Sequence, residues 1–202
     1  MPRGVAIPEI RQQLFAAAER VIVRDGPGKL SGRAVTAEAG VATGLLYSHF
    51  ADLDGFLAAF AVDRAFTIAA DCAGLIERAG EGTLAGNVCD AILAVPLHTV
   101  LASTRLLVAR PELLDQVQQV LGERSAGLDA LERSVTAYLS AEQRLARLPA
   151  AVRPEALAAA LVGIVHHRAL TDRATSETPD RIRRAITALI EGMDPAPQRS
   201  RR

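Results

Sequence analysis

The stretch LSGRAVTAEAGVATGLLYSHFADL, residues 30–53, contains two short helical patterns that meet at a glycine. Ser31 is a good N-cap for the first helix, because its hydroxyl can accept a hydrogen bond from a backbone N–H two or three residues further on. Gly40 is expected to end this helix, since glycine adopts the left-handed conformation at little cost. Thr43 can cap a second helix that runs to Phe50. Two helices joined by a tight turn form the helix-turn-helix unit, whose second helix enters the major groove of DNA.

An ordinary αα-hairpin inside a helical bundle would show the same spacing, so spacing alone leaves both interpretations open. The side chains expected on the exposed face of the second helix favour DNA, because they are small or hydrogen-bonding and none is a carboxylate. Such groups suit phosphates and base edges. They belong to Thr43, Gly44, Tyr47, Ser48 and His49.

These residues resemble the TetR family of bacterial one-component repressors. The family pattern is approximately A-G-V-S-x-G-x-L-Y-x-H-F-x-x-K-x-x-L. This chain reads AGVATGLLYSHF over residues 39–50, with Leu57 one residue after the position of the closing leucine. The match is dense from residue 8 to residue 60. Beyond residue 60 the chain resembles the family mainly in its length and in the order of its helices.

The resemblance implies an all-α fold with three parts. Residues 1–52 would form a three-helix head that binds DNA. Residues 53–194 would form a helical body that binds an effector and dimerises. Residues 195–202 are a basic, proline-containing tail that is expected to be disordered.

The resemblance also implies partners and roles for individual residues. A dimer would read an operator in double-stranded DNA and respond to a small-molecule effector. Tyr47 and His49 are expected to bind phosphate, while Leu45 replaces a commonly polar position and could touch a thymine methyl group. The expected DNA-binding residues are Arg33, Thr43, Gly44, Leu45, Tyr47, Ser48 and His49.

Two observations argue against strong DNA binding. The chain has 23 basic and 23 acidic residues, so it lacks the basic excess usual in a DNA reader. The family's lysine near the start of the fourth helix is Leu53 here, and Asp52 and Asp54 flank it where acid would repel phosphate. Asp52 could also cap this fourth helix, whose apolar face is expected to continue towards Glu77. The alternative is therefore an all-α small-molecule binding protein with weak or lost DNA binding.

The last two helical patterns, residues 154–170 and 179–193, resemble the family's dimerisation pair. Residues 156–165 are so apolar that this helix needs cover on most sides. A second subunit would supply this cover and make a homodimer. Burial within the monomer is the alternative.

The middle of the chain is apolar and contains few polar side chains, as ligand sites do. We expect a hydrophobic effector with one acidic or hydrogen-bonding end, held by Arg105 or His98. A plain core would use the same apolar residues. The candidate lining residues are Phe60, Phe66, Leu97, His98, Leu101, Arg105, Val108, Leu121, Val135 and His166.

No catalytic motif of the GxSxG, HExxH, Walker A or GxGxxG type occurs, so we expect neither an enzyme nor a cofactor. His166 and His167 are adjacent and would point about 100° apart on a helix, which disfavours a shared metal. Cys72 and Cys89 are expected to be reduced. Without a signal-peptide pattern or an apolar run of membrane-spanning length, the chain is expected to be cytoplasmic.

Overall fold

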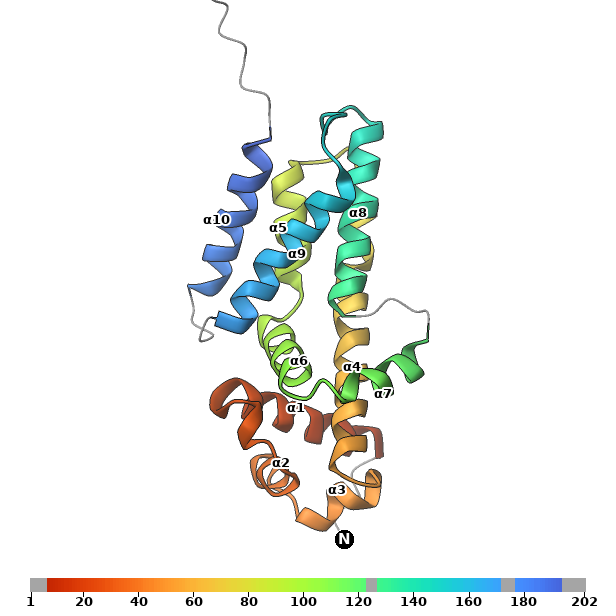
Figure 1. The fold of residues 1–202 in the computed structure, drawn as a ribbon, viewed down its shortest axis with the longest axis vertical. Helices are drawn as coiled ribbons and strands as arrows, with labels where there is room; N and C mark the ends of the chain where they lie inside the picture. The colour runs from red at the N-terminus through yellow and green to blue at the C-terminus, as the bar shows by residue number, and fades with distance from the viewer. Residues whose placement is uncertain (1–6, 123–126, 172–176, 194–202) are drawn as a thin grey trace, which may run out of the picture. The chain divides into compact units, whose positions relative to one another are not determined.

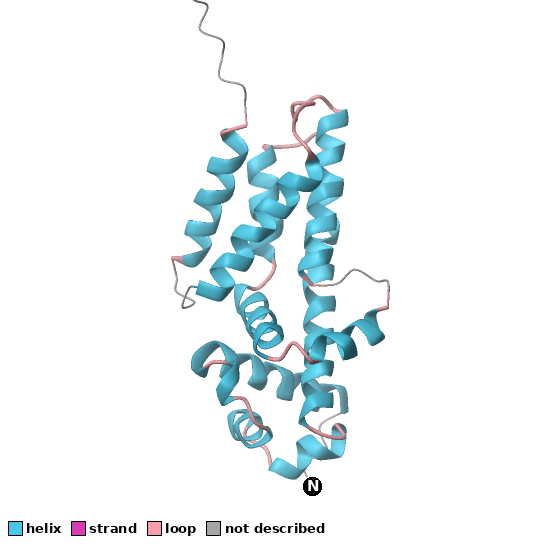
Figure 2. Ribbon diagram, viewed as in Figure 1, coloured by secondary structure: helices cyan, strands magenta, loops and turns pink. Residues whose placement is uncertain are grey.

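A computed structural model describes residues 7–122, 127–171 and 177–193, and these ranges contain helices and no strand (Figure 2). The predicted all-α fold is therefore confirmed. The tail expected at residues 195–202 lies outside the described residues. The α-helices in the described ranges are α1 (Ile7–Asp25), α2 (Gly32–Ala39), α3 (Thr43–His49), α4 (Leu53–Cys72), α5 (Leu84–Ala94), α6 (Leu97–Ala109), α7 (Leu113–Leu121), α8 (Leu128–Arg144), α9 (Pro154–Thr171) and α10 (Thr178–Glu191) (Figure 1).

Two 3-10 helices complete the described elements. The first, η1 (Pro27–Lys29), occupies the turn after α1. The second, η2 (Ala73–Arg78), follows α4, so the helix expected to continue towards Glu77 changes its winding after Cys72. Among the described residues, no single helix is long and apolar enough to cross a membrane. The helices α5 and α6 reach that length and apolar composition only when they are taken together, and they are joined at a bend.

The chain packs into two compact units. Unit 1 comprises Met1–Phe66 and His98–Arg124, and unit 2 comprises Thr67–Leu97 and Ser125–Arg202. Unit 1 thus holds α6 and α7 together with α1, α2, α3 and the first part of α4, because buried side chains of α6 join the core of the first helices. The domains predicted from the sequence, 1–52 and 53–194, were defined by function rather than by packing, and their boundaries stay a prediction.

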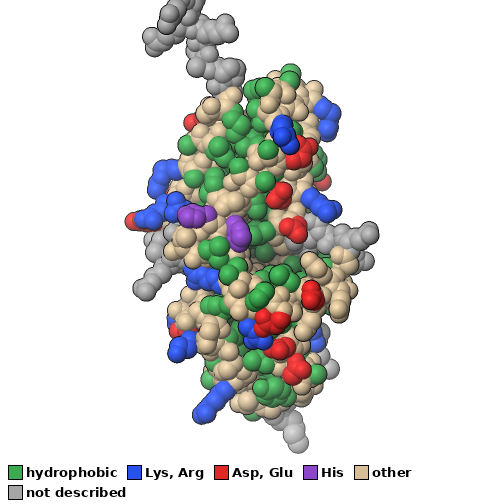
Figure 3. Space-filling view, viewed as in Figure 1, with side chains coloured by type: hydrophobic (Ala, Val, Ile, Leu, Met, Phe, Trp, Pro, Cys, Tyr) green, Lys and Arg blue, Asp and Glu red, His purple; other side chains and the backbone are tan. Residues whose placement is uncertain are grey.

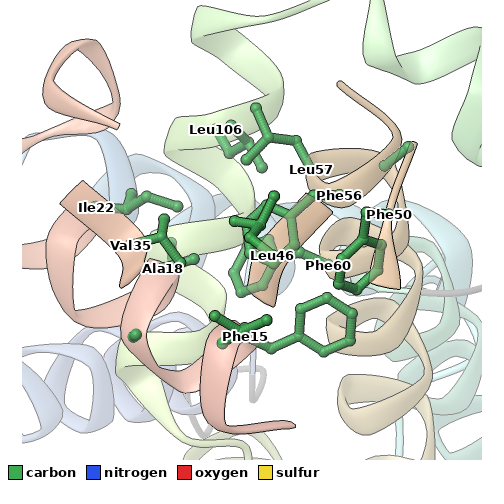
Figure 4. Close-up of a cluster of buried hydrophobic side chains, with 14 of the residues drawn as sticks. Phe15, Ala18, Ile22, Val35, Leu46, Phe50, Phe56, Leu57, Phe60 and Leu106 are labelled. Atoms are coloured by element: carbon green, nitrogen blue, oxygen red, sulfur yellow. The ribbon is translucent and has the colours of Figure 1, made fainter. Parts of the chain in front are cut away.

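The core of unit 1 is built around phenylalanine rings (Figure 4). The ring of Phe15 lies 5.8 Å from that of Phe50, 5.6 Å from that of Phe56 and 6.0 Å from that of Phe60, centroid to centroid. Aromatic pairs at such distances contribute about 0.5–1.5 kcal/mol beyond the burial of their area. This core holds α1, α3 and α4 together. The aliphatic side chains around the rings include Ala18, Ile22, Val35, Leu46, Leu57 and Leu106.

In unit 2, α8 packs on α9, and α10 packs on both α5 and α9. The facing sides of these helices are aliphatic, and their exposed sides carry most of the charge. Burial of such a face, rather than helix propensity, supplies most of the stability of a helix in a folded protein. The buried residues of these helices include Val88, Ile92, Val135, Leu139, Leu161, Val165, Ile182 and Ile186.

A buried polar cluster fixes the turn before α5. The carboxylate of Glu142 is fully buried, accepts a hydrogen bond from the Gly80 N–H at 3.0 Å and lies 3.2 Å from Nε of Arg147. Next to it, the Tyr138 hydroxyl accepts a hydrogen bond from Asn87 Nδ2 at 3.0 Å. Burial, supported by the nearby Glu142, raises the pKa of Tyr138 to about 12.

Candidate nucleic-acid interface

The turn between α2 and α3 has the geometry predicted from the sequence. The Ser31 hydroxyl accepts a hydrogen bond from the Ala34 N–H at 3.1 Å and caps α2. Gly40 ends that helix in the left-handed conformation, with φ 69° and ψ 30°. The N–H of Val41 then donates to the Thr36 carbonyl at 2.9 Å, which closes the turn. A residue with a Cβ would adopt this φ only at a cost.

The prediction that Thr43 caps α3 is wrong. Ala42 occupies the N-cap position, without a side-chain hydrogen bond, and Thr43 is the first residue of the helix. The Oγ1 atom of Thr43 lies 3.3 Å from Oγ1 of Thr36, because the turn at Gly40 directs the start of α3 back towards α2. At the other end, Phe50 leaves the helix in an extended conformation.

The two faces of α3 differ in the way that a recognition helix requires. Its inner face is held by Leu46, which is fully buried, and the following Phe50 is buried as well. Leu45 is half-buried and packs against the core of unit 1, so only part of this side chain faces outward. His49 is also half-buried. The exposed residues of the predicted set on this helix are Thr43, Gly44, Tyr47 and Ser48.

Tyr47 lies against the first turn of α2. Its side chain is about half exposed, and a Cβ placed on Gly32 would lie 2.7 Å from the Tyr47 hydroxyl oxygen. Gly32 therefore leaves the space that the ring occupies. Gly32 is not among the residues predicted from the sequence, although a glycine in the first turn of a helix, next to a good cap, is an unusual choice that could have marked it. Beside Tyr47, the Ser48 hydroxyl donates to the Leu45 carbonyl at 2.7 Å.

Ion pairs decide which arginines of the first helices remain available for phosphate. Glu38 accepts hydrogen bonds from Arg20 at 2.8 Å and from Arg24 at 2.7 Å, and these bonds hold the pKa of the Glu38 carboxyl below its usual value. Arg33 is exposed on α2 and forms no ion pair within the described part of the chain. Arg33 is therefore better placed than Arg20 or Arg24 to contact a phosphate.

The acidic residues at the start of α4 have partners. The Asp52 carboxylate accepts a hydrogen bond from the Gly55 N–H at 2.7 Å and caps α4, as the sequence predicts. Asp54 forms an ion pair with Arg110, at 2.7 Å between Oδ1 and Nη2. Arg110 also contacts Glu112. Because Arg110 is shared with Glu112, it offsets part of the charge of Asp54, which weakens the expected repulsion of DNA at this point.

Charge is mixed on the face of the protein that Figure 3 draws, where basic and acidic side chains lie together. Since the net charge of the chain is zero, we expect a phosphate contact at this interface to depend on individual side chains and on the exposed polar groups of α3.

Residues 14–60 match the family model described as bacterial regulatory proteins, tetR family. The chain thus carries the DNA-binding domain of the TetR family in these residues. The matched residues span α1, α2, α3 and the first turns of α4, which is the helix-turn-helix described above. The TetR assignment makes the protein a DNA-binding transcriptional regulator rather than an enzyme. No curated protein matches the chain.

Solved structures of other proteins share the fold over nearly the whole chain. A TetR-family regulator from Mesorhizobium loti is 16% identical, with a TM-score of 0.67 over 94% of this chain and 97% of that chain. A transcriptional regulator from Rhodococcus sp. Rha1 is 22% identical, with a TM-score of 0.68 over 93% and 99%. The multidrug binding protein EbrR, solved with imidazole, is 28% identical, with a TM-score of 0.53 over 96% and 99%.

The residues predicted to bind an effector in this TetR-family chain are dispersed. Phe60, Leu101 and Val135 are fully buried. Leu97, Arg105 and Leu121 are half-buried, whereas Val108 and His166 are exposed. Phe66 is exposed and lines an open groove of about 860 Å³ in unit 1. His98 lines a smaller pocket, of about 310 Å³, beside Glu19.

The Glu19 carboxylate joins three helices of unit 1. It lies on α1, is 5% exposed, and its Oε2 is 2.7 Å from Nε of Arg64 on α4. From α6, Nε2 of His98 lies 3.0 Å from Oε1 of Glu19, and the Thr99 hydroxyl donates to the same oxygen at 3.2 Å. Arg64 also pairs with Asp63 at 3.2 Å. His98 thus has an intramolecular partner in the state described by this structure.

Proposed function

We propose that this protein is a ligand-responsive repressor that binds a palindromic operator and releases it when a small hydrophobic effector binds the C-terminal domain. The observation that carries the proposal is the outer face of α3, where Thr43, Gly44, Tyr47 and Ser48 are exposed above a buried anchor. Small hydroxyl and backbone groups of this kind contact phosphates and base edges. Arg33, Leu45 and His49 complete the proposed contact set.

We propose a homodimer through residues 154–170 and 179–193. Several small or apolar residues of α9 are exposed, among them Ala160, Gly163 and Leu170. A Cβ on Gly163 would meet no atom within 4 Å, so this position is open. A second subunit would cover this face, and the two recognition helices would read half-sites about 34 Å apart, or a multiple of that spacing.

An effector can release DNA only if it binds the two conformations of the protein with different affinity. A hydrophobic effector is supported by the apolar lining of the groove at Phe66 and by the likeness to EbrR, which is named a multidrug binding protein. Because its proposed target is chromosomal DNA, we place the protein in the cytoplasm.

DNA binding is tested by gel shift with DNA from around the protein's own gene. Tyr47→Ala should weaken binding to all sequences by about the same factor, because a phosphate contact carries no sequence information. Tyr47→Phe isolates the hydroxyl. Both variants should keep the wild-type melting temperature, since Tyr47 is half exposed. A loss confined to one operator variant would contradict the phosphate role of Tyr47.

The same gel shift decides between the repressor and a small-molecule binding protein that has lost DNA binding. Leu53, in place of the family's lysine, is the observation that favours the second. A correctly folded dimer that binds these fragments no better than unrelated DNA at low salt would favour the binding protein.

Dimerisation is tested by light scattering at micromolar concentration. Gly163→Arg should shift the dimer towards monomer, because the arginine would stand on the proposed interface. Gly74→Arg is the matched control, since Gly74 in η2 is exposed and also has open space around its Cβ position. A wild-type monomer, or equal effects of both substitutions, would refute the proposed interface.

A further inference from the structure

The groove in unit 1 has the size and lining of a ligand site. It encloses about 860 Å³, within the range of about 300–1,000 Å³ that is typical of small-molecule sites. Its walls come from α1, α4 and α7. The floor is apolar, and the amide side chains of Gln116 and Gln119 stand on the α7 wall. The apolar residues that line it are Phe15, Ala58, Ala59, Val62, Phe66 and Val120.

The charges along this groove favour an anion. Arg11 lines it from α1 and forms no ion pair within the described part of the chain; its guanidinium instead lies over the Phe50 ring, 4.4 Å from the centroid. The acidic residue of the groove, Asp63, is already engaged: it accepts a hydrogen bond from Gln12 at 2.7 Å and pairs with Arg64 at 3.2 Å. A cation would therefore meet a carboxylate that is already hydrogen-bonded and that shares the charge of Arg64 with Glu19, whereas an anion would meet a guanidinium without a carboxylate partner.

We propose that this groove binds an amphipathic carboxylate, with the apolar chain against Phe66 and Val120 and the carboxylate on Arg11. A carboxylate and a guanidinium form charge-assisted hydrogen bonds, which are stronger than those between neutral groups. Binding of the apolar part of the ligand is favoured by burial of its surface. The site rests on α1, α4 and α7 of unit 1; its α4 and α7 residues belong to the C-terminal domain of the proposed function. Of the lining residues predicted from the sequence it includes Phe66, but neither Arg105 nor His98.

Arg11 connects this site to the recognition helix. Phe50, which the guanidinium covers, is the residue at which α3 ends, and its ring packs 5.0 Å from that of Phe56 in the core. A carboxylate that draws the guanidinium away removes this contact from the end of α3. This link to α3 rests on the effector response proposed above. Binding of the carboxylate to the groove does not rest on it and can be measured without DNA.

The test uses the full-length protein, titration calorimetry and three probes of equal chain length below their micelle-forming concentrations. The probes are dodecanoate, dodecanol and dodecylammonium. Dodecanoate should bind at least about tenfold more tightly than dodecylammonium, because only the carboxylate meets an opposite charge on Arg11. Equal affinity for the two ions, or no binding of dodecanoate, would overturn the proposal.

Two pairs of variants locate the site. Val120→Asp places a carboxylate on the groove wall and should weaken dodecanoate binding about tenfold or more, whereas Val108→Asp should not change it. Val120 and Val108 are both exposed valines of unit 1, 64% and 60%, and only Val120 lines the groove. Arg11→Gln should weaken dodecanoate binding, and Arg11→Lys should retain most of it.

The alternative outcomes are distinct. Dodecanoate binding that Val120→Asp leaves unchanged would place the ligand elsewhere and overturn the groove assignment. Binding in the groove that leaves operator affinity unaltered would confirm the site and refute the effector role proposed above.

Discussion

Removal of the Glu19 carboxylate should destabilise unit 1 through the charge it leaves behind. The Glu19 side chain is 7% exposed and that of Arg64 is 12% exposed, so the pair is nearly buried. Breaking such a pair from one side costs about 3–5 kcal/mol, because the other charge stays buried without its partner. Arg64 keeps a second carboxylate, Asp63, at 3.2 Å, and we therefore expect a loss of about 2–3 kcal/mol for Glu19→Gln.

A loss of this size is measurable by thermal or urea unfolding followed by circular dichroism. For a chain of this length, 1 kcal/mol shifts the melting temperature by about 2–4 °C, so Glu19→Gln should lower it by about 4–12 °C. Glu38→Gln is the matched control. Glu38 also pairs with two arginines, Arg20 and Arg24, but on the surface, where ion pairs contribute little.

A double-mutant cycle separates the buried charge from the loss of packing. Glu19→Leu alone should be strongly destabilising, whereas Glu19→Leu combined with Arg64→Met removes both charges and should recover most of the lost stability. If the double variant is destabilised by the sum of the single changes, the pair does not act through burial of an unpaired charge. Equal effects of Glu19→Gln and Glu38→Gln would refute the reasoning as well.

Other consequences of the structure can be measured on the folded protein alone. Gly40→Ala should lose about 1–2 kcal/mol of unfolding free energy, because φ is 69° there, whereas Gly74→Ala should lose none. Ser31→Ala should cost about 1 kcal/mol through loss of the α2 cap. Stability should fall as the pH rises from 10 towards 12, because tyrosine ionises in the unfolded chain before Tyr138 does in the folded one; Tyr138→Phe should reduce this dependence.

Features that depend on neighbouring residues could be predicted from the sequence. The caps at Ser31 and Asp52 and the glycine turn at Gly40 each involve groups within a few residues of one another, and the structure has all of them. The predicted cap at Thr43 was wrong for the opposite reason. Its hydroxyl is directed towards Thr36, seven residues earlier, by the path of the turn rather than by its own place in the helix.

The ligand groove could not be predicted, because it arises where α1, α4 and α7 meet. Apolar spacing marks residues that face a neighbour, but it does not distinguish a wall of a cavity from a filled core. Phe60 and Phe66 both fit the pattern; the first is fully buried, and the second is exposed in the groove. Arg11 was not selected at all, since a lone arginine on an amphipathic helix usually faces solvent. Its importance depends on Phe50, 39 residues further on.

The partners of the acidic residues near the expected DNA contact also could not be predicted from the sequence, and they bear on function. A count along the sequence gives Asp54 full weight as an acid beside the expected phosphate, and this count supported the alternative of lost DNA binding. In the folded chain, Arg110 lies 2.7 Å from Asp54 although the two are 56 residues apart. Arg110→Gln should therefore restore the repulsion that the sequence suggested and weaken binding to all DNA sequences. The contacts proposed for Tyr47 and Arg33 should stay in place. The extra negative charge acts through screened electrostatics, so the difference from wild type should shrink as the salt concentration rises. A difference that persists unchanged at high salt would mean that Arg110 acts by holding α4 in place rather than by offsetting charge.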